Sequence, residues 1–355
     1  MTTRPTLALD IMGGDEGPAV TLDAAQLAAR RYPEMRFLLF GDEAIINERL
    51  ATLSQLANVS EVRHTDVEVL ATDKPSQILR SARKSSIGLA VGAVKAGEAH
   101  AAVSAGNTGA LMALAKIGLK TMPGIDRPAL AALLPTMRSD SVMLDLGANA
   151  ECDDENLMQF GVMGAAFARI VLGIDTPRVA ILNIGEEELK GTDDHKEAAD
   201  ALRAASGEGG LNMVYSGFVE GDKIGRGDVD VIVSDGFSGN VALKTAEGTA
   251  KLVVELLRRA FRANLWSILG AIMSRRVLSS LKAHLDPNAH NGAVFLGLNG
   301  VVVKSHGGAN VEGFANAIGV AHDLVADNIQ ARITEDLERF QAKRVSALLQ
   351  AEAAE

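Results

Sequence analysis

The sequence has few of the residues on which several classes of protein depend. It contains one cysteine, one tryptophan and two tyrosines among 355 residues. A single cysteine can form neither an internal disulfide nor a cysteine-based zinc site, so the composition fits a reducing cytosol. Few aromatic side chains are available to stack on bases, and the formal net charge is -10. Both features argue against nucleic acid binding, which needs a positive surface.

Targeting signals and long apolar runs are also missing. The first ten residues, MTTRPTLALD, include an acid and no apolar run of signal-peptide length. No stretch reaches the roughly 20 apolar residues that a membrane span needs. We therefore expect a cytoplasmic protein, either freely soluble or peripheral at the inner face of the membrane.

The motifs of several common enzyme classes do not occur. There is no G-x-x-x-x-G-K-[ST], no G-x-G-x-x-G after the first apolar run, no G-x-S-x-G and no H-E-x-x-H. This disfavours P-loop nucleotidases, standard nicotinamide enzymes, serine α/β-hydrolases and zinc proteases. The sequence predicts a reaction without cofactor, metal or protein nucleophile, in which the protein positions two substrates and stabilises charge.

Glycine, in contrast, is frequent and gathers in loops. Apolar runs at residues 7–11, 101–104, 178–184, 229–234 and 300–304 each lead into a loop rich in Gly, Asn, Ser or Thr. Helical patterns follow most of these loops, which predicts βαβ units and a mostly parallel sheet covered on both faces. Because parallel strands end at one edge, we expect the loops to form a single site for an anion such as phosphate.

The domain organisation is less clearly marked. We expect one catalytic domain over residues 1–335 and a C-terminal helical tail over residues 336–355. Prolines and a glycine interrupt the pattern near residues 120–140, so a subdivision there is an alternative. A helix is predicted over 45–56 and a short strand at 68–70.

Five loops together resemble those of the bacterial phosphate acyltransferases of phospholipid synthesis. They read DIMGGD from residue 10, SAGNTGA from 104, LNIGEE from 182, SDGFSGNVALK from 234 and SHGGAN from 305. The resemblance covers about residues 6–330. It implies a three-layer α/β/α fold related to isocitrate dehydrogenase and phosphotransacetylase. It also implies a homodimer that transfers a fatty acyl group from acyl-[acyl carrier protein] to inorganic phosphate.

The acyl phosphate product would then be used by a membrane glycerol-3-phosphate acyltransferase, again as the resemblance implies. Two alternatives remain at this point. One is an enzyme like phosphotransacetylase that uses acyl-CoA as the acyl donor. The other is a non-enzymatic protein that binds phosphate or tethers to a membrane.

Two side chains match the catalytic positions of the family. Lys190 would bind phosphate or stabilise the oxyanion as a fixed positive charge. The alternative is a solvated lysine paired with Glu186 or Glu187. Asn240 would donate its amide to the oxyanion or to phosphate, and it could also cap the helix that follows.

Other candidates lie in the loops and at predicted helix starts, where backbone N–H groups suit an anion. The candidate phosphate- or substrate-binding residues are Gly13, Gly14, Asp15, Ser85, Ser86, Asn107, Thr108, Asp235, His306 and Asn310. For Ser85, Ser86, Asn107 and Thr108 the alternative is simple helix capping. His306 could protonate the departing thiol, because histidine exchanges protons near neutral pH.

The acids around Asp145 and Asp153 are interpreted as solvated rather than as a magnesium site, because their spacing is not a recognised ligand set. Cys152 stands among these acids, which would raise its pKa and argue against a nucleophilic role.

Residues 256–282 differ from the rest of the chain. They hold six basic residues, no acidic residue and the only tryptophan, with apolar positions spaced along one helical face. Such a segment suits a membrane surface. Docking of an acidic carrier protein and plain packing, in a core or dimer interface, are the alternatives. The candidate contact residues are Arg258, Arg262, Trp266 and Arg275.

Overall fold

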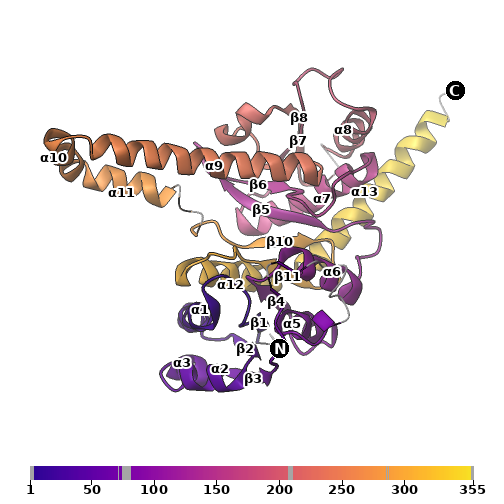
Figure 1. Ribbon diagram of the computed structural model, residues 1–355. Helices are drawn as coiled ribbons and strands as arrows, with labels where there is room; N and C mark the ends of the chain where they lie inside the picture. The colour runs from indigo at the N-terminus through magenta and orange to yellow at the C-terminus, as the bar shows by residue number, and fades with distance from the viewer. Residues whose placement is uncertain are drawn as a thin grey trace.

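The computed structural model describes residues 4–70, 72–73, 81–206, 211–284, 286 and 288–352, and its strands and helices alternate along the chain (Figure 1). The strands are β1 Thr6–Asp10, β2 Arg36–Gly41, β3 Ser60–His64, β4 Ala101–Ser104, β5 Ala129–Pro135, β6 Asp140–Leu144, β7 Arg178–Leu182, β8 Val214–Val219, β9 Val231–Val233, β10 Ala293–Leu296 and β11 Val301–Lys304. The helices are α1 Gly17–Arg31, α2 Glu43–Leu50, α3 Ser54–Val59, α5 Ser86–Lys95, α6 Thr108–Leu119, α7 Asp154–Val171, α8 Asp193–Ala205, η1 Gly221–Arg226, α9 Gly236–Phe261, α10 Leu265–Met273, α11 Arg275–His284, α12 Val311–Ala326 and α13 Ile329–Glu352.

Within the described residues the strands form one sheet, in the order β3-β2-β1-β4-β11-β10-β5-β6-β9-β7-β8. Most neighbouring strands are parallel. The exceptions lie in the middle, where β10 is antiparallel to β11 and β5, and β5 is antiparallel to β6. The sheet is therefore mostly parallel, as the sequence predicts.

The three antiparallel pairings reverse the direction of the sheet. We call β1–β4 and β11 the first half, and β6–β9 the second half. Since an odd number of reversals separates them, their strands run in opposite directions, and their carboxyl ends lie at opposite edges. The prediction that all the loops share one edge is wrong. The reversal depends on β5 and β10, whose direction no sequence pattern indicates.

Helices cover both faces of the sheet, which completes the three-layer α/β/α arrangement. Side chains of β1 alternate between two cores, as the pleat of a strand requires. Leu7 and Leu9 pack in one core with α1 and α12, whereas Ala8 packs in the other with α5 and α6. Full burial of one leucine contributes about 1.5–3 kcal/mol, so both faces of each strand stabilise the fold.

Some local predictions are corrected. Residues 68–70 do not form a strand, because β3 already occupies the sheet edge beside β2. The helix predicted over 45–56 is divided into α2 and α3 by a turn at residues 51–53.

Two features bear on the domain organisation. The interrupted region near residues 120–140 contains β5, in the centre of the sheet. Helix α13 starts at Ile329 and runs through residue 336, and its Leu337 and Phe340 are buried in the same core as α7. The residues just after 335 therefore belong to the packed body.

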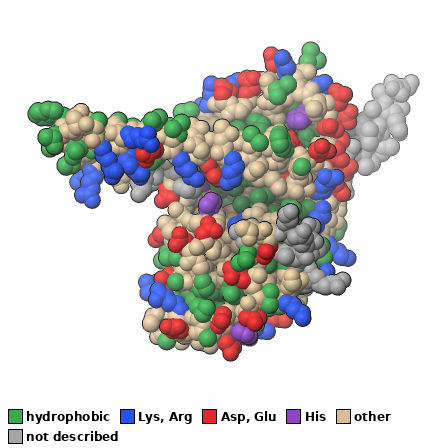
Figure 2. Space-filling model, in the orientation of Figure 1, with side chains coloured by type: hydrophobic (Ala, Val, Ile, Leu, Met, Phe, Trp, Pro, Cys, Tyr) green, Lys and Arg blue, Asp and Glu red, His purple; other side chains and the backbone are tan. Residues whose placement is uncertain are grey.

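The basic segment forms an arm. Figure 1 shows the distal part of α9, with α10 and α11, extending away from the body of the molecule. Apolar side chains gather at the end of this arm in the space-filling view (Figure 2). The exposed large apolar residues of the arm are Leu252, Val253, Leu256, Leu265, Trp266, Ile268, Leu269, Ile272, Met273 and Val277.

Candidate active site

A first loop cluster forms where β1, β4 and β11 end, from residues 10–15, 104–108 and 304–310. Asp10 is fully buried there, and burial raises the pKa of its carboxyl. Ser104 Oγ donates to Asp10 Oδ2 at 2.6 Å, and the Gly13 amide donates to Oδ1 at 3.1 Å. The Asp10 carboxyl thus fixes the first loop against the loop that follows β4.

Backbone contacts bring the loops of this cluster close together. A Cβ on Gly13 would lie 2.7 Å from the Gly106 nitrogen and closer still to Asp10, so no side chain fits there. Gly14 has a φ of +110°, which L side chains rarely adopt. The Asp15 amide donates to the Gly307 carbonyl at 2.9 Å. The structure therefore places Gly13, Gly14 and Asp15 beside the loop of His306, as one phosphate site would require.

His306 is exposed in this cluster, and its ring has a defined orientation. The Gly308 amide donates to His306 Nδ1 at 3.0 Å, and the His306 amide donates to Asn291 Oδ1 at 2.9 Å. Since Nδ1 accepts a hydrogen bond, the neutral ring carries its proton on Nε2. His306 can therefore present an N–H donor to a bound substrate.

Lys304 lies beneath the first loop cluster and was missed by the sequence reasoning. It is 9% exposed, and its Nζ donates to the carbonyls of Ala105, at 3.2 Å, and Ser305. Burial lowers the pKa of Lys304 to about 8, while the charges of Asp10 and Asp15 oppose this shift. A lysine that ends an apolar strand, as in VVVK, is the signal that could have identified it.

The serines and asparagines at helix starts act as caps. Ser85 Oγ accepts from the Gly88 amide at 3.3 Å, Asn107 Oδ1 from Ala110 at 3.0 Å and Asn310 Oδ1 from Gly313 at 2.8 Å. Thr108 is the first residue of α6, and the buried Ser86 hydroxyl bonds to Asp10. The capping alternative is thus confirmed for Ser85 and Asn107, and a contact of these residues with phosphate stays a prediction.

A second loop cluster forms where β6, β7 and β9 end. Asp145 is buried in it, so the prediction that it is solvated is wrong. It accepts hydrogen bonds from backbone amides, including those of Ala148 at 2.9 Å and Asn149 at 2.7 Å. Asp153 caps α7 through the Asn156 amide at 2.8 Å. Both acids are occupied by backbone donors, and no group of three or more His, Cys, Asp or Glu among the described residues is arranged to hold a metal ion.

Lys190 lies in the second cluster, in a loop closed by Asn183. Asn183 Nδ2 donates to the Lys190 carbonyl at 3.0 Å, and the Ile184 amide donates to Asn183 Oδ1 at 2.8 Å. Glu186 pairs with Lys223 at 2.7 Å. Lys190 itself is exposed and has no ion-pair partner in the described part of the chain. The predicted alternative, pairing with Glu186 or Glu187, is therefore not found.

Asn240 lies in the first turns of α9 and does not cap it. Asp235 is the cap, because its Oδ1 accepts from the Ser238 amide at 2.8 Å. Asn240 is exposed, and its side chain lies beside Gly147 of the second cluster. The amide of Asn240 is thus left available to a ligand, and Asp235 holds the helix start that positions it.

Helix α9 connects the two clusters. Asn240 and Lys244 are four residues apart and share one helix face. Burial lowers the pKa of Lys304, and the positive charge of Lys244 adds to this shift. Asp15 lies against Gly307 in the first cluster, and no ion pair between Asp15 and Lys190 occurs among the described residues.

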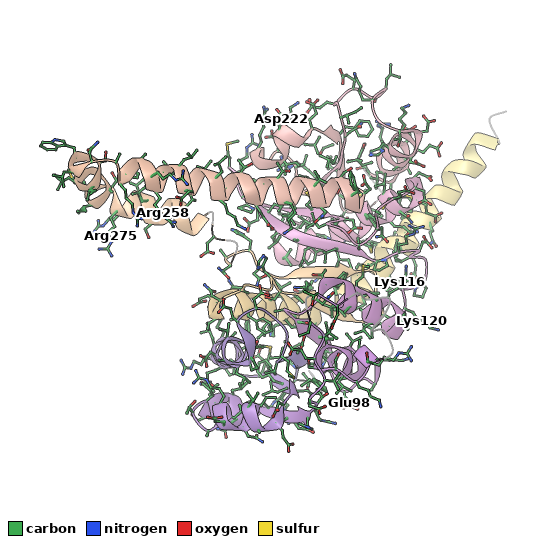
Figure 3. The ribbon with its side chains drawn as sticks, viewed as in Figure 1. Glu98, Lys116, Lys120, Asp222, Arg258 and Arg275 are labelled. Atoms are coloured by element: carbon green, nitrogen blue, oxygen red, sulfur yellow. The ribbon has the colours of Figure 1, made fainter. Side chains whose placement is uncertain are left out.

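The remaining candidate residues lie outside the two loop clusters or lack the reactivity for a catalytic role. Arg258, Arg262, Trp266 and Arg275 belong to the arm, where Figure 3 shows Arg258 and Arg275 well away from the body. Burial raises the pKa of the Cys152 thiol to about 12, which agrees with its predicted lack of nucleophilic character. No described helix has the length and apolar character that crossing a membrane would require.

The fold is that of the phosphotransacetylases. A phosphotransacetylase from Streptococcus pyogenes superimposes with a TM-score of 0.62 at 17% identity, covering 92% of this chain and 95% of its own. The EutD phosphotransacetylase from Staphylococcus aureus gives a TM-score of 0.56 at 20% identity, covering 90% and 94%. The chain therefore has the α/β/α fold of these phosphotransacetylases.

Sequence relatives identify the family within this class. A family model described as "Fatty acid synthesis protein" matches residues 5–332. A phosphate acyltransferase of Erythrobacter litoralis is 56% identical over 334 residues, 94% of this chain and 93% of its own. Another, from Rhodospirillum rubrum, is 52% identical over 341 residues, 96% and 97% of the two chains. The chain belongs to the phosphate acyltransferase family and is an acyltransferase, so the non-enzymatic alternative is wrong.

Proposed function

We propose that the enzyme transfers a fatty acyl group from acyl-[acyl carrier protein] to inorganic phosphate, giving acyl phosphate for phospholipid synthesis. The observation that carries this proposal is the surroundings of Lys190 and Asn240. Exposed apolar side chains flank both residues: Ile184, Leu189, Phe237 and Val241. A cation and an amide among apolar side chains suit a thioester carbonyl at the head of a long acyl chain.

The proposed reaction needs no protein nucleophile. Phosphate, held by the first loop cluster, attacks the thioester carbonyl, and a new carbon–oxygen bond forms. The negative charge that develops on the carbonyl oxygen is stabilised by Lys190 and by the Asn240 amide. The carbon–sulfur bond then breaks, and the thiolate takes up a proton from water, while neutral His306 can donate a hydrogen bond from Nε2 to the departing sulfur. The protein contributes position and charge stabilisation.

The competing donor is acyl-CoA, which the phosphotransacetylase fold favours. The two donors are separated by an assay of acyl phosphate formation from inorganic phosphate with each thioester in turn. The proposal expects a much higher kcat/KM with the acyl carrier. Formation of acyl phosphate from acyl-CoA but not from the acyl carrier would overturn it.

We further propose that the arm contacts a membrane surface and that the protein acts as a homodimer. Trp266 is 83% exposed and Met273 89% exposed at the end of the arm. Basic residues beside exposed apolar ones suit an anionic lipid surface. Acyl phosphate is a reactive mixed anhydride, so delivery to a membrane-bound glycerol-3-phosphate acyltransferase at that surface would protect it from hydrolysis.

Binding to vesicles tests the membrane contact. The intact protein is expected to bind vesicles that contain anionic phospholipid, and Trp266→Ser with Met273→Ser is expected to weaken that binding. Equal binding by the double variant would contradict membrane contact. The mass in solution, measured by light scattering, tests the homodimer, and a monomeric mass would overturn it.

A further inference from the structure

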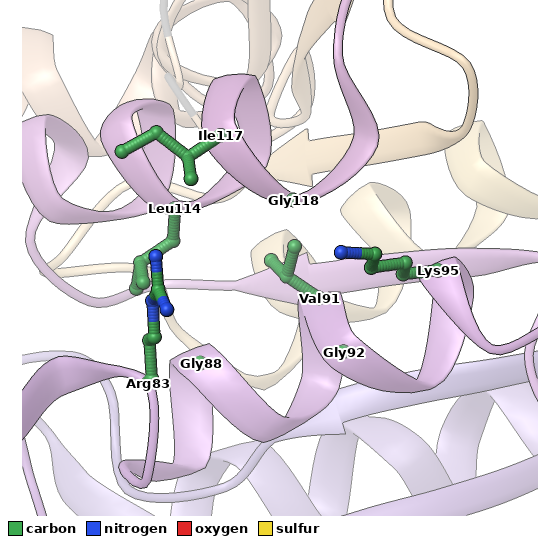
Figure 4. Close-up of a pocket in the computed structure, with 8 residues that line it drawn as sticks. All are labelled: Arg83, Gly88, Val91, Gly92, Lys95, Leu114, Ile117 and Gly118. Carbon is green, nitrogen blue, oxygen red and sulfur yellow. The ribbon is translucent and has the colours of Figure 1, made fainter. Parts of the chain in front are cut away.

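A groove runs between α5 and α6, outside both loop clusters. It encloses a cavity of about 240 Å³. The buried Val91 of α5 and Leu114 of α6 form its floor, and Ile117 of α6, 46% exposed, forms an apolar wall. Arg83 and Lys95 lie at its two ends (Figure 4). An apolar trough with a cation at each end suits a ligand that is apolar in the middle and acidic at both ends.

A glycine keeps this groove open. Gly92 lies inside α5, where glycine is less favourable than alanine by about 0.5–1 kcal/mol. A Cβ on Gly92 would meet no atom within 4 Å, so no packing constraint requires glycine there. Gly88 is different, because a Cβ there would collide with the Ala82 carbonyl. Packing therefore does not explain why residue 92 is glycine, and its small size leaves space in the groove.

The rim of the groove is basic, and its cations have no ion-pair partner among the described residues. The exposed basic residues on and beside the two helices are Arg83, Lys84, Lys95, Lys116 and Lys120. In the described part of the chain none of them takes part in an ion pair, whereas Glu98, beyond the end of α5, pairs with Arg63 at 3.3 Å. A protein with a net charge of -10 therefore carries here a patch of unpaired positive charge.

The groove leads to the active site. Helix α5 begins at Ser86, which bonds to Asp10, and α6 begins after Asn107, so both helices start at the first loop cluster. Helix α5 has 10 residues, which corresponds to a length of about 15 Å. A partner seated along the groove would therefore hold a flexible thioester arm within reach of the cluster.

The arm of the molecule offers a different surface. Figure 3 places Arg258 and Arg275 on the arm and Lys116 and Lys120 at the opposite side of the view. Arg258 and Arg259 are already paired with Glu255, at 3.2 and 3.0 Å. Arg262, Arg275 and Arg276 of the arm are exposed and take part in no ion pair among the described residues, and they stand beside many exposed apolar side chains. The α5–α6 groove differs in having cations around a small, mostly buried apolar floor.

We propose that the α5–α6 groove is the docking site for an acidic amphipathic helix of the acyl carrier. The proposal rests on the proposed function, in which that carrier is the acyl donor. The apolar face of the helix fills the trough against Val91, Leu114 and Ile117. Its acidic residues pair with the free cations at the rim, Arg83 and Lys95 foremost.

The test compares acyl-carrier and acyl-CoA kinetics in groove variants of the intact enzyme. Lys95→Glu with Lys116→Glu reverses two rim charges, and Gly92→Leu fills the trough with a good helix former. Each is expected to raise KM for the acyl carrier by tenfold or more. The kcat, the KM for phosphate and the slow rate with acyl-CoA should stay unchanged. Gly92→Ala and Arg30→Glu, an exposed cation on α1, are matched controls that should keep the wild-type KM.

An unchanged KM for the carrier in both groove variants would overturn the docking site. An equal loss with acyl-CoA would also overturn it, because the groove would then hold the acyl chain itself. Failure of the proposed function looks different. In that case the wild-type enzyme makes no acyl phosphate from the acyl carrier at all, while acyl-CoA remains a substrate.

Discussion

Asn183 Nδ2 donates a hydrogen bond to the carbonyl of Lys190 across 3.0 Å, so the side chain at the end of β7 closes the loop that presents the proposed catalytic cation. The same amide group accepts from the Ile184 backbone at 2.8 Å. Gly191, with a φ of +86°, leaves room for this contact, since a Cβ there would lie 2.5 Å from Asn183 Oδ1. The position of Lys190 therefore depends on a residue that does not itself face the substrate.

Replacing Asn183 by alanine should displace Lys190 without removing it. Loss of both hydrogen bonds frees the loop, and a catalytic group misplaced by about 1 Å costs on the order of 100-fold in rate. We expect kcat to fall by roughly 10- to 100-fold, with KM for phosphate little changed. In Asn183→Asp, which keeps the acceptor for the Ile184 amide, kcat should fall less than in Asn183→Ala. Equal activity of wild type and Asn183→Ala would show that the loop needs no closure.

Gly13→Ala should disrupt the first loop cluster. The new methyl group would press on the Gly106 nitrogen and on the buried Asp10, and overpacking of this kind costs about 1–3 kcal/mol. We expect a lower free energy of unfolding in urea and a raised KM for phosphate. Gly248→Ala is the control, because a Cβ there meets nothing within 4 Å and should stabilise α9 by about 0.5–1 kcal/mol. Wild-type behaviour of Gly13→Ala would contradict the close approach of the loops.

Lys304 should make stability depend on pH. Its pKa is lowered from 10.5 to about 8 by burial, so between these values the unfolded chain binds more protons than the folded one. Stability therefore rises with pH across this window, by up to about 3 kcal/mol at 1.36 kcal/mol per pKa unit.

The measurement is urea unfolding of wild type and Lys304→Met at several pH values. Wild-type stability, relative to the variant, should be lowest at pH 7 and should increase from pH 8 toward 10.5. A difference between the two proteins that stays constant across this range would show that Lys304 is not held as a buried cation.

The apolar residues around Lys190 and Asn240 should select long acyl chains. Phe237 is 69% exposed and Leu189 88% exposed, and each buried methylene contributes about 0.8 kcal/mol. Phe237→Ala should lower kcat/KM for a long-chain donor about tenfold and leave that for a short-chain donor unchanged. A uniform loss with both donors would mean that Phe237 supports the helix start and not the acyl chain.

The loops could be predicted from the sequence, but their division into two groups could not. Glycine-rich segments after apolar runs mark the ends of β1, β4, β7, β9 and β11, and the mostly parallel sheet follows from their alternation with helices. The reversal in the middle depends on β5 and β10, which are apolar runs without a directional signal. Tertiary pairing, rather than local propensity, decides their direction.

The site could also be predicted only in part, because local signals mark some of its residues and tertiary contacts determine the others. Capping by Ser85 and Asn107 follows from residue type and position. The choice of Asp235 rather than Asn240 as the cap of α9 depends on where the helix begins, and helix ends are uncertain by one or two residues. Lys304 and Asn183 escaped notice because their importance comes from burial and from contacts that only the folded chain creates.

The most direct test of the central claim is acyl phosphate formation by Lys190→Ala, with acyl carrier and inorganic phosphate as substrates. Loss of one group that stabilises an oxyanion costs about 10²–10³ in kcat. The account predicts a fall of this size, partial recovery in Lys190→Arg and an unchanged free energy of unfolding, since the Lys190 side chain is exposed and unpaired in the described structure. Wild-type kcat in Lys190→Ala would contradict the account.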